Sequence, residues 1–119
     1  STYDQQEYTF IPSLGMSPSE FWGEADRLAK EKGMDRILAY MYLMIKEANK
    51  KKIPITREHF QSLGAEVGLL PGVKTWFKRI NEFGKSLGVN VEHYIISSGL
   101  KEIMELTPIA IYFKRIYAC

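Results

Sequence analysis

The fold of this chain is decided by Leu69-Leu70-Pro71-Gly72-Val73 and by the later run Tyr94-Ile95-Ile96-Ser97-Ser98-Gly99-Leu100. Between the two, apolar residues recur at helical spacing from Val73 to Leu87, and Gly88 ends this predicted helix. The following segment, 89–97, contains an unbroken apolar run that predicts a strand buried on both faces, as in a parallel sheet. The sequence therefore predicts a helix that leads into a buried strand.

The polar turn after this strand is the first candidate for a binding site. Ser97-Ser98-Gly99 leads from the strand into a short predicted helix over 100–105. Such a turn presents hydroxyl and backbone N–H groups to an oxyanion. A further strand is predicted over 115–118, so the order helix–strand–helix–strand indicates an α/β fold for residues 69–119.

The first half of the sequence predicts helices and no strands. Residues 1–16 are typical of an irregular or extended lead. A helix is then predicted after the N-cap Ser17, a second after Asp35 and a short third after Thr56. Because short connections join the three helices, we expect the lead and a small helical subdomain to fill residues 1–68.

The composition excludes several classes of protein. A net charge of +2 is too small to indicate nucleic-acid binding, and 45% hydrophobic residues suffice for a packed core. The one cysteine, Cys119, excludes an internal disulfide and is typical of a reducing cytoplasm. No apolar run approaches the length of about 18 residues that spans a membrane, and no signal-peptide pattern opens the chain. We expect a cytoplasmic protein that binds neither nucleic acid nor membrane.

The pattern over residues 69–119 resembles the haloacid dehalogenase-like (HAD) hydrolase superfamily, in its phosphoserine-phosphatase-like branch. The Leu-Pro-Gly-Val helix, the strand ending in Ser-Ser-Gly and the tail Ile-Ala-x-Tyr-Phe-x-Arg-Ile-Tyr-Ala (109–118) look like the middle of the hydrolase core in order and spacing. The resemblance implies part of a Rossmann-like core, with residues 15–66 as the helical cap inserted after the family's first motif. Most members of this superfamily are magnesium-dependent phosphatases.

The resemblance also implies a phosphate site and a substrate pocket. By motif position, Ser97 would hydrogen-bond the phosphoryl group of the substrate, and Ser98 and Gly99 would complete the turn. Cap helices face the substrate in HAD relatives. The side chains that would line the pocket from the cap are those of Trp22, Tyr40 and Tyr42.

Three catalytic motifs of the family are missing from this sequence. It lacks the Asp-x-Asp pair that supplies nucleophile and acid/base, the third-motif Lys, and the acidic pair that binds Mg²⁺. Asp4, Asp26 and Asp35 cannot replace them, because none ends an apolar strand. The first motif is expected upstream of Ser1 and the others beyond Cys119. We therefore expect the chain as given to be catalytically incompetent, with no metal site, whereas the intact family uses Mg²⁺.

Two features predict a macromolecular partner. The family strand that lies beside the strand over 89–97 is missing, so one strand edge would have unpaired N–H and C=O groups that a second copy or a protein partner could cover. Leu106 also stands where relatives often have a glycine, and a leucine would be strained in the left-handed conformation that glycine adopts there. Ile111 is unusually apolar for a half-exposed position. The pair indicates either a repacked core or an interaction surface.

Three functional interpretations follow from the sequence. The chain is a fragment or derivative of a HAD-like phosphatase, or an engineered or natural protein-binding module that uses the surface near Leu106 and Ile111. The third interpretation is a natural regulatory or structural protein that has kept the fold and lost the chemistry. The identity of the substrate cannot be predicted, because cap residues determine it.

Overall fold

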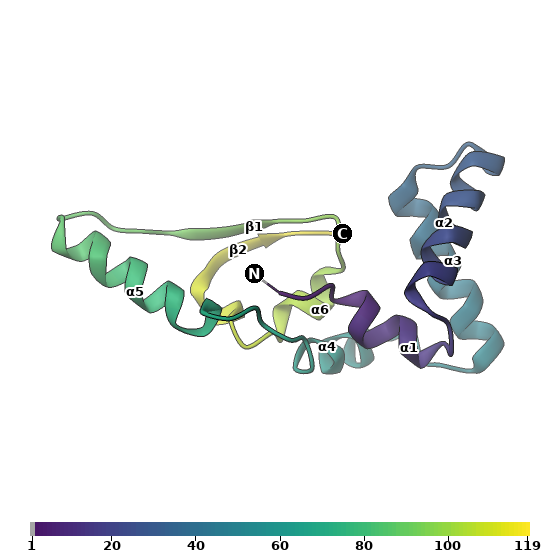
Figure 1. Cartoon of the computed structure of the whole chain (residues 1–119), viewed down its shortest axis with the longest axis horizontal. Helices are drawn as coiled ribbons and strands as arrows, with labels where there is room; N and C mark the ends of the chain where they lie inside the picture. Colours follow the sequence, from purple (N-terminus) through teal and green to yellow (C-terminus); the bar gives the residue numbers. More distant parts are fainter. Residues whose placement is uncertain (1) are drawn as a thin grey trace.

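Two parallel strands, β1 (His93–Ile96) and β2 (Phe113–Tyr117), run along the long axis of the molecule (Figure 1). The computed structural model describes residues 2–119 and measures 53 × 27 × 23 Å. Helices α2 and α3 stand across one end of the sheet, and helix α5 covers the other end (Figure 1). Mixed helix and parallel strand confirm the predicted α/β class at this coarse level.

The N-terminal segment is helical, so the prediction of an irregular or extended lead is wrong. A π-helix, η1 (Gln6–Phe10), continues directly into the one-turn helix α1 (Ile11–Ser13). The Asp4 carboxylate accepts hydrogen bonds from the backbone N–H groups of Gln6 (2.9 Å) and Glu7 (2.8 Å). It thereby satisfies donors at the start of the segment that no earlier turn can satisfy.

The first long helix, α2 (Pro18–Lys32), forms as its sequence predicts. Ser17 accepts a hydrogen bond from the Glu20 N–H, and the Glu20 side chain accepts one from the Ser17 N–H, which completes a capping box. Gly33 ends the helix with a φ of 61°, a left-handed conformation that glycine adopts without steric cost.

The two following helices are capped by the predicted residues. Asp35 accepts hydrogen bonds at the start of α3 (Arg36–Lys51), and Thr56 does so at the start of α4 (Arg57–Gly64). Gly64 lies so close to the Ile103 carbonyl of α6 (Lys101–Glu105) that any Cβ would overlap it. Glycine at this position therefore permits the close packing of α4 against α6.

One hydrophobic core joins the helical half to the second half of the chain. Its members come from the N-terminal segment, from α2 to α4, and from the segment around α6. The largest fully buried side chains are those of Phe10, Phe21, Ile11, Leu14, Leu43 and Ile103. Residues on both sides of the predicted boundary at residue 68 therefore share the same core.

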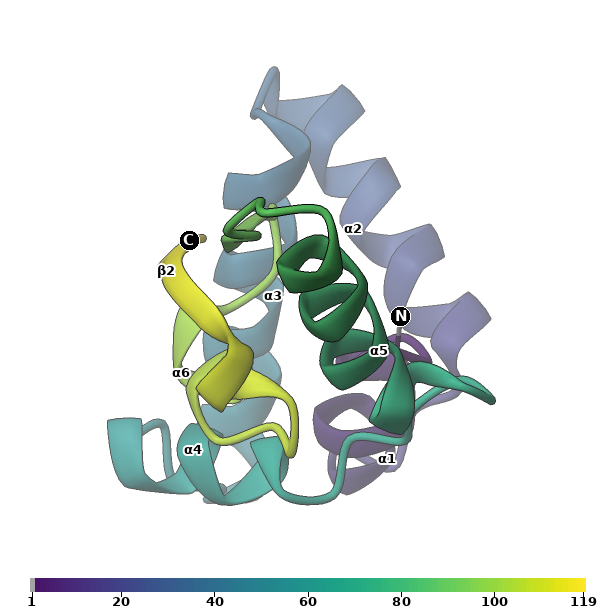
Figure 2. The same ribbon diagram turned by 90° about the vertical axis from the view of Figure 1, so that its left-hand side faces the viewer.

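Helix α5 (Val73–Ser86) covers one face of the sheet through an aromatic cluster around Phe77. The Phe77 ring lies 5.0 Å from the His93 ring, 4.9 Å from that of Tyr112 and 5.2 Å from that of Phe113, measured between centroids. Seen from the α5 end, this helix lies beside β2, with α2 and α3 behind (Figure 2). The end of the molecule opposite α2 and α3 is thus held mainly by ring packing.

The opposite face of the sheet is open, so the prediction of a strand buried on both faces is wrong. Tyr94 and Ile96 of β1 alternate with the half-buried His93 and Ile95, and the Ile96 side chain is 88% exposed. Tyr117, the register partner of Ile96, is exposed as well. The apolar run suggested burial on both faces, but α5 covers only one of them.

The two positions that suggested an interaction surface are both exposed. Leu106, at the end of α6, is 52% exposed and has a φ of −111°, so the expected left-handed strain is absent at this residue. Ile111, in the 3₁₀ turn η2 (Ala110–Tyr112), is 84% exposed. In residues 2–119, no helix combines the length and apolarity that crossing a membrane requires.

Candidate functional site

A cleft of about 400 Å³ separates α2 and α3 from the turn that follows β1. It is the place where parts of the chain far apart in sequence come together. Trp22 and Tyr40 contribute to it from the helices, and the turn 97–99 contributes from the sheet. The other lining residues are Asp4, Gln6, Ala25, Asp26, Arg36 and Ile37.

The topology of the sheet places the turn at this cleft. The strands are parallel, so their carboxyl ends meet at one edge, where ligands bind in open α/β sheets. The N–H of Ser97 donates to the Tyr117 carbonyl at 2.9 Å, and the N–H of Cys119 donates to the Gly99 carbonyl at 3.1 Å. These two bonds hold the turn between the strand ends.

Within the turn, Ser97 and Gly99 have complementary roles. The Ser97 Oγ accepts a hydrogen bond from the Gly99 N–H at 3.0 Å, so its own hydrogen is left to donate elsewhere. A Cβ at position 99 would overlap the Gln5 amide nitrogen. Glycine therefore leaves room for the end of the Gln5 side chain beside the turn.

Tyr40 connects helix α3 to the turn. Its buried hydroxyl donates a hydrogen bond of 2.6 Å to the Ser98 carbonyl, across 58 residues of sequence. Burial raises the pKa of Tyr40, because the phenolate would lose hydration, and the Gln6 side chain beside the hydroxyl opposes this effect. At neutral pH the phenol is therefore a stable donor.

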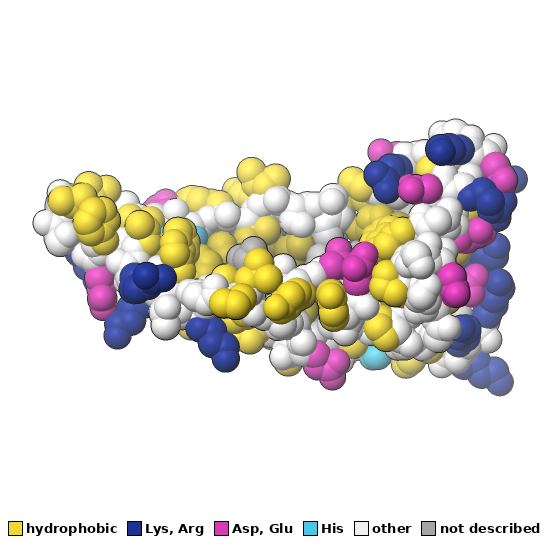
Figure 3. Space-filling view, viewed as in Figure 1, with side chains coloured by type: hydrophobic (Ala, Val, Ile, Leu, Met, Phe, Trp, Pro, Cys, Tyr) yellow, Lys and Arg dark blue, Asp and Glu magenta, His cyan; other side chains and the backbone are white. Residues whose placement is uncertain are grey.

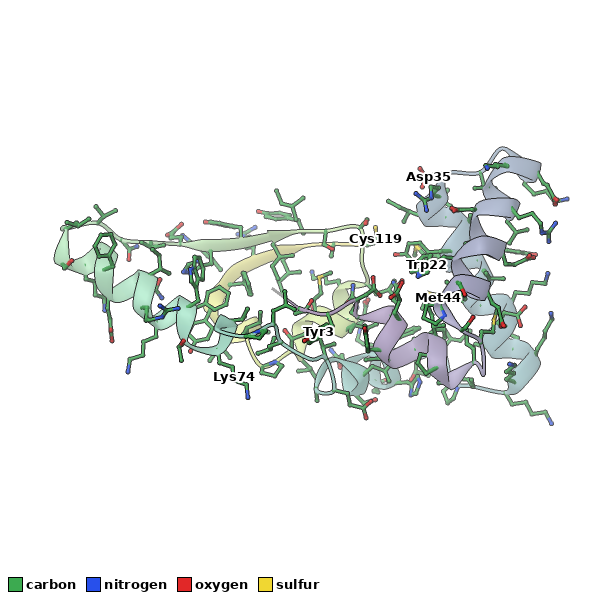
Figure 4. The ribbon with its side chains drawn as sticks, in the orientation of Figure 1. Tyr3, Trp22, Asp35, Met44, Lys74 and Cys119 are labelled. Carbon is green, nitrogen blue, oxygen red and sulfur yellow. The ribbon has the colours of Figure 1, made fainter. Side chains whose placement is uncertain are left out.

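Trp22 forms the aromatic wall of the cleft and is held from three sides. Its indole N–H donates to a Glu7 carboxylate oxygen at 2.9 Å. The ring packs edge to face on Phe21 and Tyr40, with centroid distances of 5.2 and 5.7 Å. Figure 4 shows Trp22 on the side of α2 and α3 that faces Cys119.

The charged groups of the cleft are paired with each other or with the backbone. Arg36 Nε lies 2.8 Å from Asp26 Oδ1 at the solvent-exposed rim, and the Asp4 carboxylate accepts the two backbone bonds described above. No group of three His, Cys, Asp or Glu side chains that could bind a metal ion occurs within residues 2–119.

The structure brings most, but not all, of the expected site residues together. Trp22 and Tyr40 share the cleft with Ser97, Ser98 and Gly99. Tyr42 is 51% exposed and lies outside the cleft, in a depression that Arg27 and Lys46 also line. Lys and Arg side chains gather on the outer side of α2 and α3, away from the sheet (Figure 3).

The sequence did not predict six further residues of the cleft: Asp4, Gln6, Ala25, Asp26, Arg36 and Ile37. Asp4 followed by a polar helical turn is a capping signal that the sequence does contain. Arg36 and Ile37 follow the predicted cap Asp35, so they were expected on a helix but had no predicted orientation. No sequence signal indicates the burial of Gln6.

Comparison of the chain with protein-family models, curated proteins and solved structures finds no match.

Proposed function

We propose that this chain is the cap and phosphate-binding part of a HAD-like phosphohydrolase and binds a phosphate monoester in the cleft. One observation supports the proposal above the others. The turn that the resemblance assigns to phosphate and two of the three cap residues it assigns to the substrate line the same cleft, although up to 77 positions separate them in sequence (99 − 22).

The chemistry of the turn is suited to a phosphoryl oxygen. The Ser97 hydroxyl retains its hydrogen, and the strand ends fix its position. Neutral donors held in place stabilise an oxyanion without reorganising, which is the basis of anion recognition in such turns. Because the sequence contains no Asp-x-Asp pair, we propose that residues 1–119 bind the ester without hydrolysing it.

Titration with inorganic phosphate tests this function. Replacing Ser97 with Ala removes a hydrogen bond to a charged group, typically about 1.5 kcal/mol or more, so the affinity should fall about tenfold. Ser86→Ala is the matched control, because the Ser86 hydroxyl donates to the Phe83 carbonyl on α5, outside the cleft. Equal affinities of the two variants would refute the proposal.

The exposure of Ile111 and Leu106 favours a second candidate, a protein-binding module. Isolated exposed apolar residues are ordinary, but Ile111 directly precedes β2, and within residues 2–119 the two-stranded sheet has an open apolar face and unpaired outer edges. Under this proposal a second copy or another protein covers the surface. Sedimentation velocity of the chain and of its Ile111→Lys variant distinguishes a self-associating surface, which the lysine disrupts, from a monomer that is unchanged.

A further inference from the structure

We propose that the ester bound in this cleft carries an uncharged aromatic ring, which packs against Trp22. The inference rests on the proposed function and specifies the class of ligand. Its basis is the contrast between the two ends of the cleft. Polar donors gather near Ser97, and apolar side chains gather on the walls that α2 and α3 provide.

The polar end is a built site. Gln6 is only 4% exposed, yet it lines the cleft next to the hydroxyl of Tyr40. Burying an amide is unfavourable unless it is hydrogen-bonded, and the Gln6 side chain has the Tyr40 hydroxyl as a partner. The Ser97 hydroxyl, whose hydrogen is not used within the turn, marks where the phosphate lies.

The wall that Trp22 and Ile37 form is apolar. The indole N–H of Trp22 is used by Glu7, so the ring offers its π surface and edge but no donor. Ile37 adds an aliphatic surface to the same wall. Phe21 and Tyr40 pack on the indole and fix its orientation, so an aromatic ligand would meet a wall that is already ordered.

The rim does not select for a charged ligand tail. Arg36 is the cationic residue that lines the cleft, and Asp26 pairs with it at 2.8 Å. Because this ion pair is neutral as a whole, the rim does not favour a second charged group on the ligand over a neutral one. A cleft of about 400 Å³ has room for a ring besides the phosphate.

The two tryptophans of the chain permit a direct test. Trp76→Phe leaves Trp22 as the sole indole, whereas Trp22→Phe leaves Trp76, which lies on α5 and does not line the cleft. Each single-tryptophan protein is titrated with phenyl phosphate, methyl phosphate and inorganic phosphate while its fluorescence is recorded. We expect phenyl phosphate to change the emission of Trp22 but not that of Trp76.

Affinities supply the second readout. Phenyl phosphate should bind about tenfold more tightly than methyl phosphate to the Trp76→Phe protein, the gain expected for burying and stacking one ring. Trp22→Leu keeps an apolar side chain and should reduce that preference to about twofold or less, with binding of inorganic phosphate retained. Circular dichroism of the Leu variant establishes that it folds, and Trp22→Phe should keep most of the preference.

The outcomes separate the two proposals. If inorganic phosphate binds in a Ser97-dependent way but phenyl and methyl phosphate bind equally, the aromatic ligand is refuted and the phosphate site stands. If phenyl phosphate binds Trp22→Leu as tightly as the parent, the ring lies elsewhere and the inference is likewise refuted. If none of the three compounds binds, both proposals fail.

Discussion

Replacing Tyr40 with Phe should weaken the attachment of helix α3 to the turn 97–99. The substitution removes only the hydroxyl that donates to the Ser98 carbonyl at 2.6 Å, and it keeps the buried ring. A hydrogen bond of this kind contributes about 0.5–1.5 kcal/mol net. Because Ser98 is exposed and water can reach its carbonyl, we expect the free energy of unfolding to fall by about 1 kcal/mol.

The matched control for this change is Tyr42→Phe. Tyr42 lies on the same helix, but its side chain is exposed and does not line the cleft. In urea denaturation, the free energy of unfolding should fall for Tyr40→Phe and should change by no more than about 0.5 kcal/mol for Tyr42→Phe. Thermal unfolding should show a midpoint about 4 °C lower for Tyr40→Phe. Equal stabilities of the two variants would refute the role of this hydrogen bond.

The pH dependence of stability gives an independent test of the same residue. Burial raises the pKa of Tyr40 in the folded state, so the folded protein holds this proton more tightly than the unfolded chain. The corresponding stability is complete below the unfolded pKa of about 10 and is lost as the pH rises through the folded value. The parent should therefore lose more stability than Tyr40→Phe above pH 10, and parallel curves would contradict this.

Four other substitutions test the remaining steps of the account. Gly99→Ala places a Cβ against the movable end of the Gln5 side chain and should cost up to about 1 kcal/mol. Gly23→Ala, in the open interior of α2, should instead stabilise by about 0.5–1 kcal/mol, and urea denaturation measures both changes. Asp4→Ala should cost about 1 kcal/mol, since it removes the cap of the N-terminal segment, and an unchanged midpoint would show that Asp4 is not a cap. Ile111→Lys should leave stability within about 0.5 kcal/mol because the side chain is exposed, and a larger loss would show that this side chain is packed in the folded protein.

Local signals in the sequence were sufficient for the helix boundaries. The caps Ser17, Asp35 and Thr56 act on backbone groups two or three residues away, so the sequence contains all the information that they need. The apolar face of α5 could be predicted for the same reason, because its helical periodicity is local. The N-terminal helical segment, which the sequence analysis did not predict, also begins at a local capping residue, Asp4.

Features that depend on distant parts of the chain could not be predicted in this way. Successive helical residues are rotated by about 100°, so Tyr40 and Tyr42 lie about 200° apart and cannot both face one cleft. The packing of α3 decides which of the two tyrosines faces the cleft. Whether Ile96 is covered depends on which face of the sheet α5 occupies, and the apolar run has the same composition in either case.

The central claim is that the turn after β1 binds phosphate beside the cap helices. The most direct test is to add inorganic phosphate to the ¹⁵N-labelled chain and to follow the amide resonances by NMR. The account predicts saturable shifts of the Ser98 and Gly99 amides, with the Trp76 indole unchanged. Shifts confined to the lysine-rich segment 50–52, or no saturable shift at the turn, would contradict it.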